Sequence, residues 1–275
     1  METKVLDKGF VRLIDSMGGD SAIVQAARVS YGKGTKTVSE DRALIRFLMR
    51  HRHTSVFEQV VLKFHIKAPI SVIRQFFRHR TQSVNELSLR YSEASEDYYL
   101  RDLENYKGQG GGNKQVGGAE LSQEDREFFH YQMEKHSNEC LKTYQLLIDC
   151  GLAREAARDV LPVNWYSEFY TTINLHNLFH LIGLRVKPNA QYEIRQFARA
   201  LLEGAQLVAP AATEAFKDYV LDSISFSRAE IEAFKGREGD LEGLLGVMGK
   251  TEKAEFLRKL EVLGVSLPHP VEKSQ

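Results

Sequence analysis

The segment LKFHIKAPISVIRQFFRHRTQSVNELSLRY, residues 62–91, changes its hydrophobic period twice. Apolar and polar residues alternate from Leu62 to Lys67, which predicts a half-buried strand. Pro69 suits the first turn of a helix, and we expect this helix to continue to about Arg80. Alternation returns in the last part of the segment and predicts a second strand. The segment is therefore typical of a strand, a helix and a strand in close succession.

Residues on either side of this segment show further strand and helix patterns. A strand is expected at 9–17, followed by a helix capped by Asp20 or Ser21 and by a second helix from Ser39. The remaining predicted elements are helices at 122–150, 154–159, 174–186 and 188–208 and a strand at 163–173. The glycine-rich run 107–118 predicts a mobile surface loop.

The overall charge and hydropathy argue against two kinds of partner. The 37 Lys and Arg residues balance the 37 Asp and Glu residues, so no global field favours a nucleic acid or a membrane. An anion site must therefore come from a local concentration of arginines. No apolar run approaches the roughly 20 residues that cross a bilayer, and the first residues lack the apolar core of a signal peptide. We therefore expect a cytoplasmic protein.

The two cysteines, Cys140 and Cys150, lie on a predicted helix. Their spacing matches neither a disulfide framework nor a zinc site, and it favours a reducing compartment. A cysteine nucleophile would need a cationic, partly exposed setting. Leucine and isoleucine neighbour both cysteines, so we expect these side chains to serve packing.

The end of the helix predicted after Pro69 carries a polar cluster. Arg74 and Arg78 lie four residues apart, and Gln75 and His79 fall beside Arg78 on the helix surface. Cations are favoured near a helix C-terminus, so a charged helix end would explain these residues without any ligand. A binding surface is the alternative.

Beyond this helix, the expected strand arranges polar side chains on one face. Glu86, Ser88 and Arg90 point one way, while Leu87 and Leu89 point the other. Arginine can bind phosphate with two hydrogen bonds, serine can add one, and glutamate can accept from a hydroxyl or a ring N–H. Together with the helix end, this row predicts either an anionic, nucleotide-like ligand site or a surface ion-pair network.

The motif Arg-His-Arg at 78–80, then seven residues, then Ser88 resembles the signature of flavin-dependent thymidylate synthases. The likeness continues through Asn85-Glu86 and Arg90-Tyr91, which makes chance agreement implausible. Further segments that resemble the family are 27–31, 53–58 and 156–162. The chain is identified on these residues as similar to that family over most of its length.

This resemblance implies a fold, an activity and an assembly. The fold is α+β, with mixed helices packed on a largely antiparallel sheet in one domain, residues 1–222, and with a C-terminal helical extension at 223–275. The activity is that of a methyltransferase that makes dTMP from dUMP. Its one-carbon donor is 5,10-methylenetetrahydrofolate, and FAD reduced by NADPH supplies the hydride. The assembly is a homotetramer with its sites at subunit interfaces.

The resemblance also assigns site residues. The dUMP contacts fall on Gln75, Phe76, Phe77, Arg78, Glu86, Leu87, Ser88, Leu89, Arg90, Arg158 and Arg185. The FAD contacts fall on Ser55, Arg78, His79, Arg80, Glu86, Asn174, Leu175, His176 and His180. Arg185 takes the catalytic role, because a fixed cation beside the uracil ring stabilises negative charge that develops there. His176 stands where arginine is common in the family, and His180 where asparagine is.

Several alternatives stay open from the residues themselves. Ser88 is either a ligand contact or a nucleophile, although no histidine–carboxylate relay is evident around it. His176 and His180 have the spacing of a zinc pair, but the glutamate of a His-Glu-x-x-His motif is absent, so we expect no metal. Two other functional classes are a non-catalytic flavin- or nucleotide-binding protein and a nucleic-acid-binding module that tracks phosphates with its arginines.

Overall fold

The computed structural model describes residues 1–29, 37–110, 117–235 and 248–265. It divides the chain into two compact units, Met1–Leu221 and Asp222–Gln275. In the second unit, helices α9 (Arg228–Lys235) and α11 (Lys250–Val262) are joined by an ion pair. The Lys259 ammonium lies 2.6 Å from the carboxylate of Glu230, which is 2% exposed.

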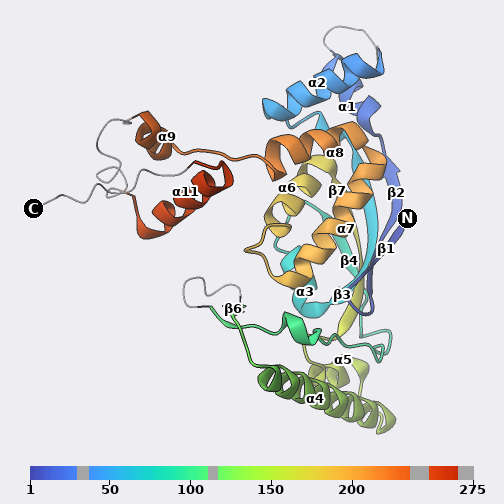
Figure 1. Cartoon of the computed structure of the whole chain (residues 1–275). Helices are drawn as coiled ribbons and strands as arrows, with labels where there is room; N and C mark the ends of the chain where they lie inside the picture. Colours follow the sequence, from blue (N-terminus) through green and yellow to red (C-terminus); the bar gives the residue numbers. More distant parts are fainter. Residues whose placement is uncertain (30–36, 111–116, 236–247, 266–275) are drawn as a thin grey trace, which may run out of the picture. The chain divides into compact units, whose positions relative to one another are not determined.

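A five-stranded sheet forms the centre of the first unit (Figure 1). Its strands, in spatial order, are β1 (Glu2–Val5), β2 (Gly9–Met17), β3 (Val61–Pro69), β7 (Tyr166–Asn174) and β4 (Ser83–Glu86). Every neighbouring pair is antiparallel. Helices pack on this sheet, so the α+β fold expected from the resemblance is confirmed.

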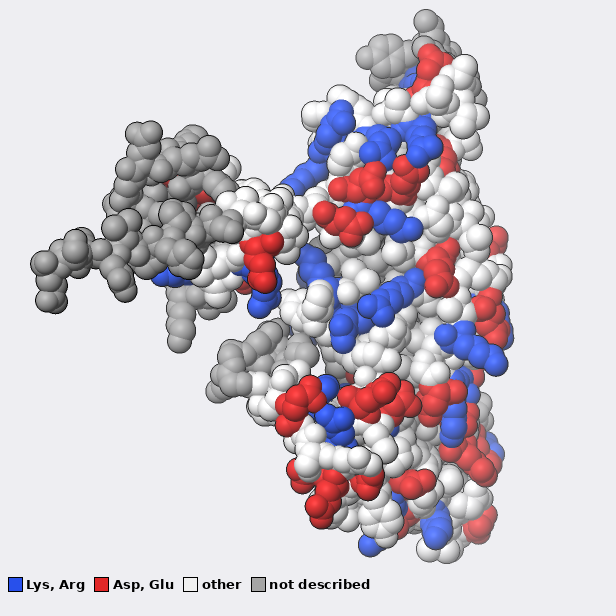
Figure 2. Space-filling model, in the orientation of Figure 1, with Lys and Arg blue, Asp and Glu red and all other residues white. Residues whose placement is uncertain are grey.

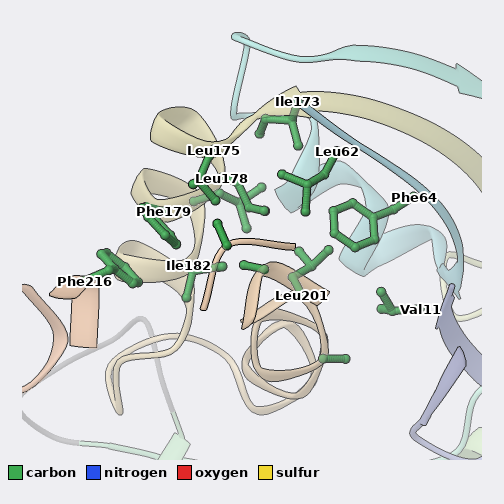
Figure 3. Close-up of a cluster of buried hydrophobic side chains, with 14 of the residues drawn as sticks. Val11, Leu62, Phe64, Ile173, Leu175, Leu178, Phe179, Ile182, Leu201 and Phe216 are labelled. Atoms are coloured by element: carbon green, nitrogen blue, oxygen red, sulfur yellow. The ribbon is translucent and has the colours of Figure 1, made fainter. Parts of the chain in front are cut away.

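The alternation in β3 places its apolar residues in the core, as predicted. Leu62, Phe64 and Ile66 are each 0% exposed. Helices α6 (Leu175–Arg185), α7 (Tyr192–Val208) and α8 (Pro210–Phe216) cover this face of the sheet (Figure 1). Figure 3 shows Leu62 and Phe64 pointing toward apolar side chains of these helices. The stacked rings of Phe179 and Phe216, 4.2 Å apart, join α6 to α8 within the same core.

Gly204 lets α7 approach the sheet closely. A β-carbon added at this position would lie 2.7 Å from Cε1 of Phe64, which real side chains do not tolerate. Phe64 is completely buried, so its ring has no free space to move into. We expect any side chain at this position to destabilise the fold by about 1–3 kcal/mol.

Asp20 caps a helix, but not the one predicted from the sequence. Helix α1 (Asp20–Ala27) begins after Gly19 and has no side-chain cap. The carboxylate of Asp20 instead accepts hydrogen bonds from the backbone N–H groups of Ala211 and Ala212, at 2.8 and 2.9 Å. It therefore caps the first turn of α8, where a negative charge is favoured by the helix dipole.

Helix α2 (Val38–Arg50) begins with a capping box rather than at Ser39. Thr37 accepts from the backbone of Glu40, and the Glu40 carboxylate accepts from the backbone of Thr37. A short 3-10 helix, Phe57–Gln59, leads from there into β3.

The other predicted helices are present, with small shifts at their ends. Helix α4 (Gln123–Asp149) is capped by Ser122, and α5 (Arg154–Ala157) continues as a 3-10 turn over Arg158–Val160. Asn174 caps α6 as predicted, whereas α7 begins at Tyr192, later than expected. A further 3-10 turn spans Leu103–Asn105, and a π-helical turn spans Lys217–Leu221.

The ends of the glycine-rich run are more regular than predicted. Strands β5 (Gly108–Gln109) and β6 (Gly117–Ala119) pair antiparallel. Residues 111–116 of the expected loop lie outside the described residues. The prediction of irregular backbone is therefore wrong at both flanks, because glycine backbones can still pair when two segments are brought together.

Candidate functional site

Helix α3 (Ile70–Phe76) ends earlier than the sequence predicted. Its last residue, Phe76, is 1% exposed, and its ring contacts those of Phe169 and Phe197 at 5.4 and 6.0 Å. Packing in the core thus fixes the end of the helix. The residues that follow turn away, with His79 buried and its two arginine neighbours exposed.

The rings of Phe76 and Phe77 pack in the hydrophobic core. Phe77 is half-buried, and its ring meets Phe169 edge-on at 5.6 Å. The carbonyl oxygen of Phe76 already accepts from the side chain of Gln82 at 2.8 Å and from the N–H of His79 at 2.9 Å. Both lone pairs of this carbonyl oxygen are therefore used within the protein.

Arg185 reaches the end of α3 from the last turn of α6. Its Nε donates to Nε2 of His79 at 3.0 Å, and its Nη2 donates to the carbonyl oxygen of Gln75 at 3.4 Å. These two hydrogen bonds fix the plane of the guanidinium. We refer to Gln75, Arg78, His79 and Arg185 as the helix-end cluster.

His79 is neutral at physiological pH. Its pKa is lowered from 6.5 to about 4, first because burial disfavours the charged ring and then because Arg185 and His180 repel a second positive charge. Since Nε2 accepts from Arg185, the ring proton resides on Nδ1. Burial and the nearby Arg78 also lower the pKa of Arg185, whose guanidinium nevertheless stays charged.

The helix-end cluster carries positive charge without a carboxylate partner. Within the described residues, Arg78 makes no side-chain hydrogen bond or ion pair, and Arg185 pairs with no acid. Arg74 and Arg80 are exposed and also lack a protein partner in that part of the chain. Adjacent guanidinium groups repel each other unless an anion lies between them, so this surface is suited to bind one.

The strand expected over Glu86 to Arg90 is absent. Strand β4 stops at Glu86, and the N–H of Leu87 donates to the carbonyl oxygen of Glu168 at 2.8 Å. A turn follows, closed by the N–H of Tyr91 and the carbonyl oxygen of Ser88 at 3.1 Å. The prediction that Glu86, Ser88 and Arg90 form a single row on one strand face is therefore wrong. Two leucines in alternate positions are also compatible with a turn.

After the turn, Arg90 and Arg158 both contact Glu155. The carboxylate of Glu155 lies 3.3 Å from Nε of Arg90, and the carbonyl oxygen of Glu155 accepts from Nε of Arg158 at 3.2 Å. Oγ of Ser88 accepts from the N–H of Arg90 at 3.4 Å, and no histidine bonds to Ser88 within the described residues. We refer to Ser88, Arg90, Glu155 and Arg158 as the turn cluster.

The structure brings the expected dUMP contacts together as two separate groups. No hydrogen bond or ion pair among the described residues joins the helix-end cluster to the turn cluster. Glu86 and Leu87 are exposed between them, and Leu89 is half-buried. Within one chain, the expected dUMP contacts therefore fall into two groups by their hydrogen bonds and ion pairs.

The expected flavin contacts are dispersed around the start of α6. Ser55 is exposed, and Asn174 uses its side-chain oxygen to cap α6 by accepting from the N–H of Asn177 at 2.9 Å. Leu175 is 0% exposed, so its side chain belongs to the core. His176 is half-buried, while His180 is exposed and its ring lies 6.1 Å from that of His79.

The described ranges lack two other features, a metal-binding cluster and a membrane-spanning helix. No group of three or more His, Cys, Asp or Glu side chains among these residues is arranged to hold a metal ion. No helix in the same ranges combines the length and the apolar character needed to cross a membrane.

The cysteines lie apart from both clusters, on and just after α4. Burial and the neighbouring Glu139 raise the pKa of the Cys140 thiol, which disfavours a thiolate. Cys150 is exposed, so the expectation that it serves packing is wrong for this residue.

A polar network behind Gln75 was not predicted from the sequence. Gln191 and Glu193 lie at the start of α7, and together with Tyr99 and Arg101 they line a cavity of about 470 Å³. One signal could have revealed it. Glu193 falls on the apolar stripe of α7 with Phe197 and is 1% exposed, an unusual position for an acid.

A family model and individual known proteins similar to this chain all indicate the same family. The model of a family described as thymidylate synthase complementing protein, Thy1, matches residues 12–211. A flavin-dependent thymidylate synthase from Thermus thermophilus is 54% identical over 232 residues, which cover 84% of each chain. One from Treponema pallidum is 47% identical over 257 residues, which cover 93% of this chain and 83% of that protein.

Solved structures give the same fold. The chain is similar to a UMP/dUMP methylase, PolB, from Streptomyces cacaoi, whose crystal structure was solved with 5-bromo-dUMP bound. The sequences are 35% identical, and the match covers 80% of this chain and 99% of that one, with a TM-score of 0.71.

Proposed function

The chain belongs to the Thy1 family, the flavin-dependent thymidylate synthases, and from this premise we propose that it makes dTMP from dUMP by reductive methylation. The one-carbon donor in this proposal is 5,10-methylenetetrahydrofolate, and FAD reduced by NADPH is the hydride source. The observation that carries the proposal is the pair of uncompensated guanidinium groups, Arg78 and Arg185, beside a histidine that stays neutral.

Arg185 is proposed to activate the uracil ring. Its Nε–H and one Nη2–H are used by His79 and Gln75, so its other N–H groups remain for a ligand. A guanidinium held in this way needs little reorganisation when negative charge develops on a uracil oxygen during attack at the ring. His79 contributes by accepting from Arg185 in its neutral form, since a charged ring would repel the same guanidinium.

The nucleotide phosphate is proposed to bind to arginines of the two clusters. Arg90 and Arg158 gather around one residue, Glu155, and each has N–H groups that these contacts do not use. Ser88 adds a hydroxyl next to Arg90. Charge-assisted hydrogen bonds from guanidinium groups to phosphate are stronger than neutral ones, so these residues can supply most of the affinity.

The two clusters support a shared site between subunits. We propose a homotetramer in which the helix-end cluster of one subunit and the turn cluster of another enclose one dUMP. The exposed side chains of Arg78 in the first cluster and Arg90 in the second support this arrangement, because both remain available to a neighbouring subunit.

FAD binding fits part of the residue set that the resemblance assigns. Arg78 and Arg80 are exposed guanidinium groups without protein partners in the described part of the chain, which suits a diphosphate, and the hydroxyl of Ser55 is exposed. His79 and His180 would lie beside it, whereas Leu175 could contribute main-chain atoms only. When bound, FAD supplies the hydride that reduces the transferred one-carbon unit.

A nucleic-acid-binding function is less well supported. The chain is formally neutral, and Figure 2 shows acidic and basic side chains interspersed over the visible face of the first unit. The strong salt dependence of polynucleotide binding requires a continuous basic surface. A cytoplasmic location without nucleic-acid or membrane partners is part of the proposal.

Tritium release from 5-tritiated dUMP tests the proposed activity. The reaction contains the purified protein with added FAD, 5,10-methylenetetrahydrofolate and NADPH, and each component is omitted in turn. We expect tritium release together with dTMP, and loss of dTMP when the folate or the reductant is left out. A protein that binds FAD and dUMP but forms no dTMP would instead be the non-catalytic binding protein.

A further inference from the structure

A chain of hydrogen bonds leads from a buried carboxylate to the side chain of Gln75. We propose that Gln191 and Glu193 are positioning residues, which hold the Gln75 amide in a single orientation for dUMP. The inference rests on the proposed function in one respect, because it takes dUMP as the ligand of Gln75. The residues themselves lie behind the helix-end cluster and would not touch the nucleotide.

Glu193 is the buried end of this series of hydrogen bonds. Its side chain is 1% exposed, and one carboxylate oxygen accepts from Nε of Arg101 at 2.7 Å and from the hydroxyl of Tyr99 at 3.2 Å. The other oxygen accepts from Nε2 of Gln191 at 2.7 Å. Burial raises the pKa of Tyr99, so its hydroxyl remains a donor. A carboxylate paired with a guanidinium can only accept, and this property determines the direction of every following bond.

The acceptor Glu193 determines the amide orientation of Gln191, and Gln191 in turn determines that of Gln75. Because the NH₂ group of Gln191 faces Glu193, its carbonyl oxygen must face away. That oxygen accepts from Nε2 of Gln75 at 2.8 Å. If the Gln75 amide were flipped, two carbonyl oxygens would oppose each other in a half-buried space, at the cost of a hydrogen bond.

The fixed orientation leaves defined groups of Gln75 for a ligand. Its Oε1 has no protein partner among the described residues, and its second N–H makes only a marginal contact, 3.5 Å long, with the carbonyl oxygen of Ser71. The backbone carbonyl of the same residue accepts from Arg185. Gln75 therefore connects the buried network to the guanidinium assigned to catalysis.

Alone, the Gln75 side chain would sample both amide orientations. A ligand that needs one of them would then bind more weakly, because part of the population is not competent. Gln191 and Glu193 remove this loss before the ligand arrives. Their contribution should therefore appear in the affinity for dUMP and not in the rate of the chemical step.

The test measures dUMP binding and turnover in a double-mutant cycle with the FAD-loaded protein. Gln191→Met keeps the side-chain length but removes both hydrogen bonds, and Gln75→Ala removes the group that is positioned. The control is Gln196→Met, the same chemical change on α7, where the glutamine accepts a hydrogen bond from Arg199 and has no other side-chain partner in the described part of the chain. Thermal unfolding of each variant verifies that it is folded.

We expect Gln191→Met to raise the Kd for dUMP roughly threefold to tenfold, the value of one hydrogen bond, with kcat at saturating dUMP unchanged. Gln196→Met should bind like the wild type. In the Gln75→Ala background, Gln191→Met should add no further loss, because nothing remains to be positioned.

Three results would overturn the inference. They are a wild-type Kd for Gln191→Met, a wild-type Kd for Gln75→Ala, and losses that add in the double variant. If the wild-type protein itself fails to bind dUMP, the proposed function fails instead, and the two failures are thus distinguished.

Discussion

The helix-end cluster and the turn cluster differ in how firmly the protein holds their arginines. Arg185 is half-buried and is oriented by His79, which is 8% exposed, and by the backbone of Gln75. The side chain of Arg90 is 57% exposed, and its ion-pair partner, the Glu155 carboxylate, is 60% exposed. An exposed ion pair such as that of Arg90 contributes only about 0–1 kcal/mol, whereas hydrogen bonds to a buried histidine and to the backbone fix the geometry of Arg185.

This difference assigns different tasks to the two groups. A pre-oriented guanidinium can stabilise charge in a transition state without moving, which affects kcat. An exposed and weakly paired guanidinium can turn toward an incoming phosphate, which affects the KM for the nucleotide. Variants in the two clusters should therefore separate kcat from KM.

Arg185→Ala is expected to have the largest effect. Loss of one oriented charge-stabilising group should lower kcat roughly 100- to 1,000-fold. FAD should stay bound, as measured by flavin absorbance after gel filtration. Arg199→Ala, an exposed arginine of α7, is the matched control and should retain activity. Wild-type turnover by Arg185→Ala would refute the activating role.

Arg90→Ala should act on substrate affinity. Removal of a charge-assisted hydrogen bond to phosphate should raise the KM for dUMP roughly 10- to 100-fold. Turnover at saturating dUMP should stay close to that of the wild type. If kcat falls as far as in Arg185→Ala, the division of tasks between the clusters is wrong.

The buried histidine should make stability depend on pH. His79 has a pKa of about 4 in the folded chain, below its ordinary value of 6.5, so the unfolded chain binds more protons between these values. The free energy of unfolding should therefore fall as the pH is lowered through this window, by about 1–3 kcal/mol.

Urea denaturation of the wild type and of His79→Gln measures this contribution. Glutamine can still accept from Arg185 but does not titrate, so the stability of the variant should depend less on pH over the same window. Equal pH dependence in the two proteins would mean that His79 titrates normally in the folded state.

Glu155→Gln should have the smallest effect. It removes the carboxylate that competes with phosphate for Arg90, and the exposed pair is worth little. The KM for dUMP should fall by no more than about threefold. A rise in KM would instead mean that Glu155 holds Arg90 in the orientation that binds.

Local patterns predicted the parts of the fold that depend on neighbouring residues. The alternation from Leu62 to Ile66 and the capping side chain of Asn174 both reappear in the structure. Over Glu86 to Arg90 the same reasoning failed, because so short an alternation does not distinguish a strand from a turn.

Contacts between distant residues could not be derived in this way. Asp20 caps a helix that begins at Pro210, and a local capping rule has no means to identify such a partner. Gln75 and Gln191 meet only because α3 and α7 pack on the same sheet. The family motif marked Gln75 and Arg185 as site residues, but the hydrogen bonds that orient them are products of tertiary structure.

Subunit complementation tests most directly whether the two clusters complete one site. Arg185→Ala and Arg90→Ala chains with different affinity tags are co-expressed, and mixed oligomers are purified through both tags. Activity is measured at a dUMP concentration well below the raised KM of Arg90→Ala, where both parent proteins are expected to be slow. If a site takes one cluster from each of two subunits, roughly a quarter of the mixed sites contain no substitution, and activity at this dUMP concentration should return to about that fraction of the wild type. Mixed oligomers no more active at this concentration than the average of the two parents would contradict the shared site.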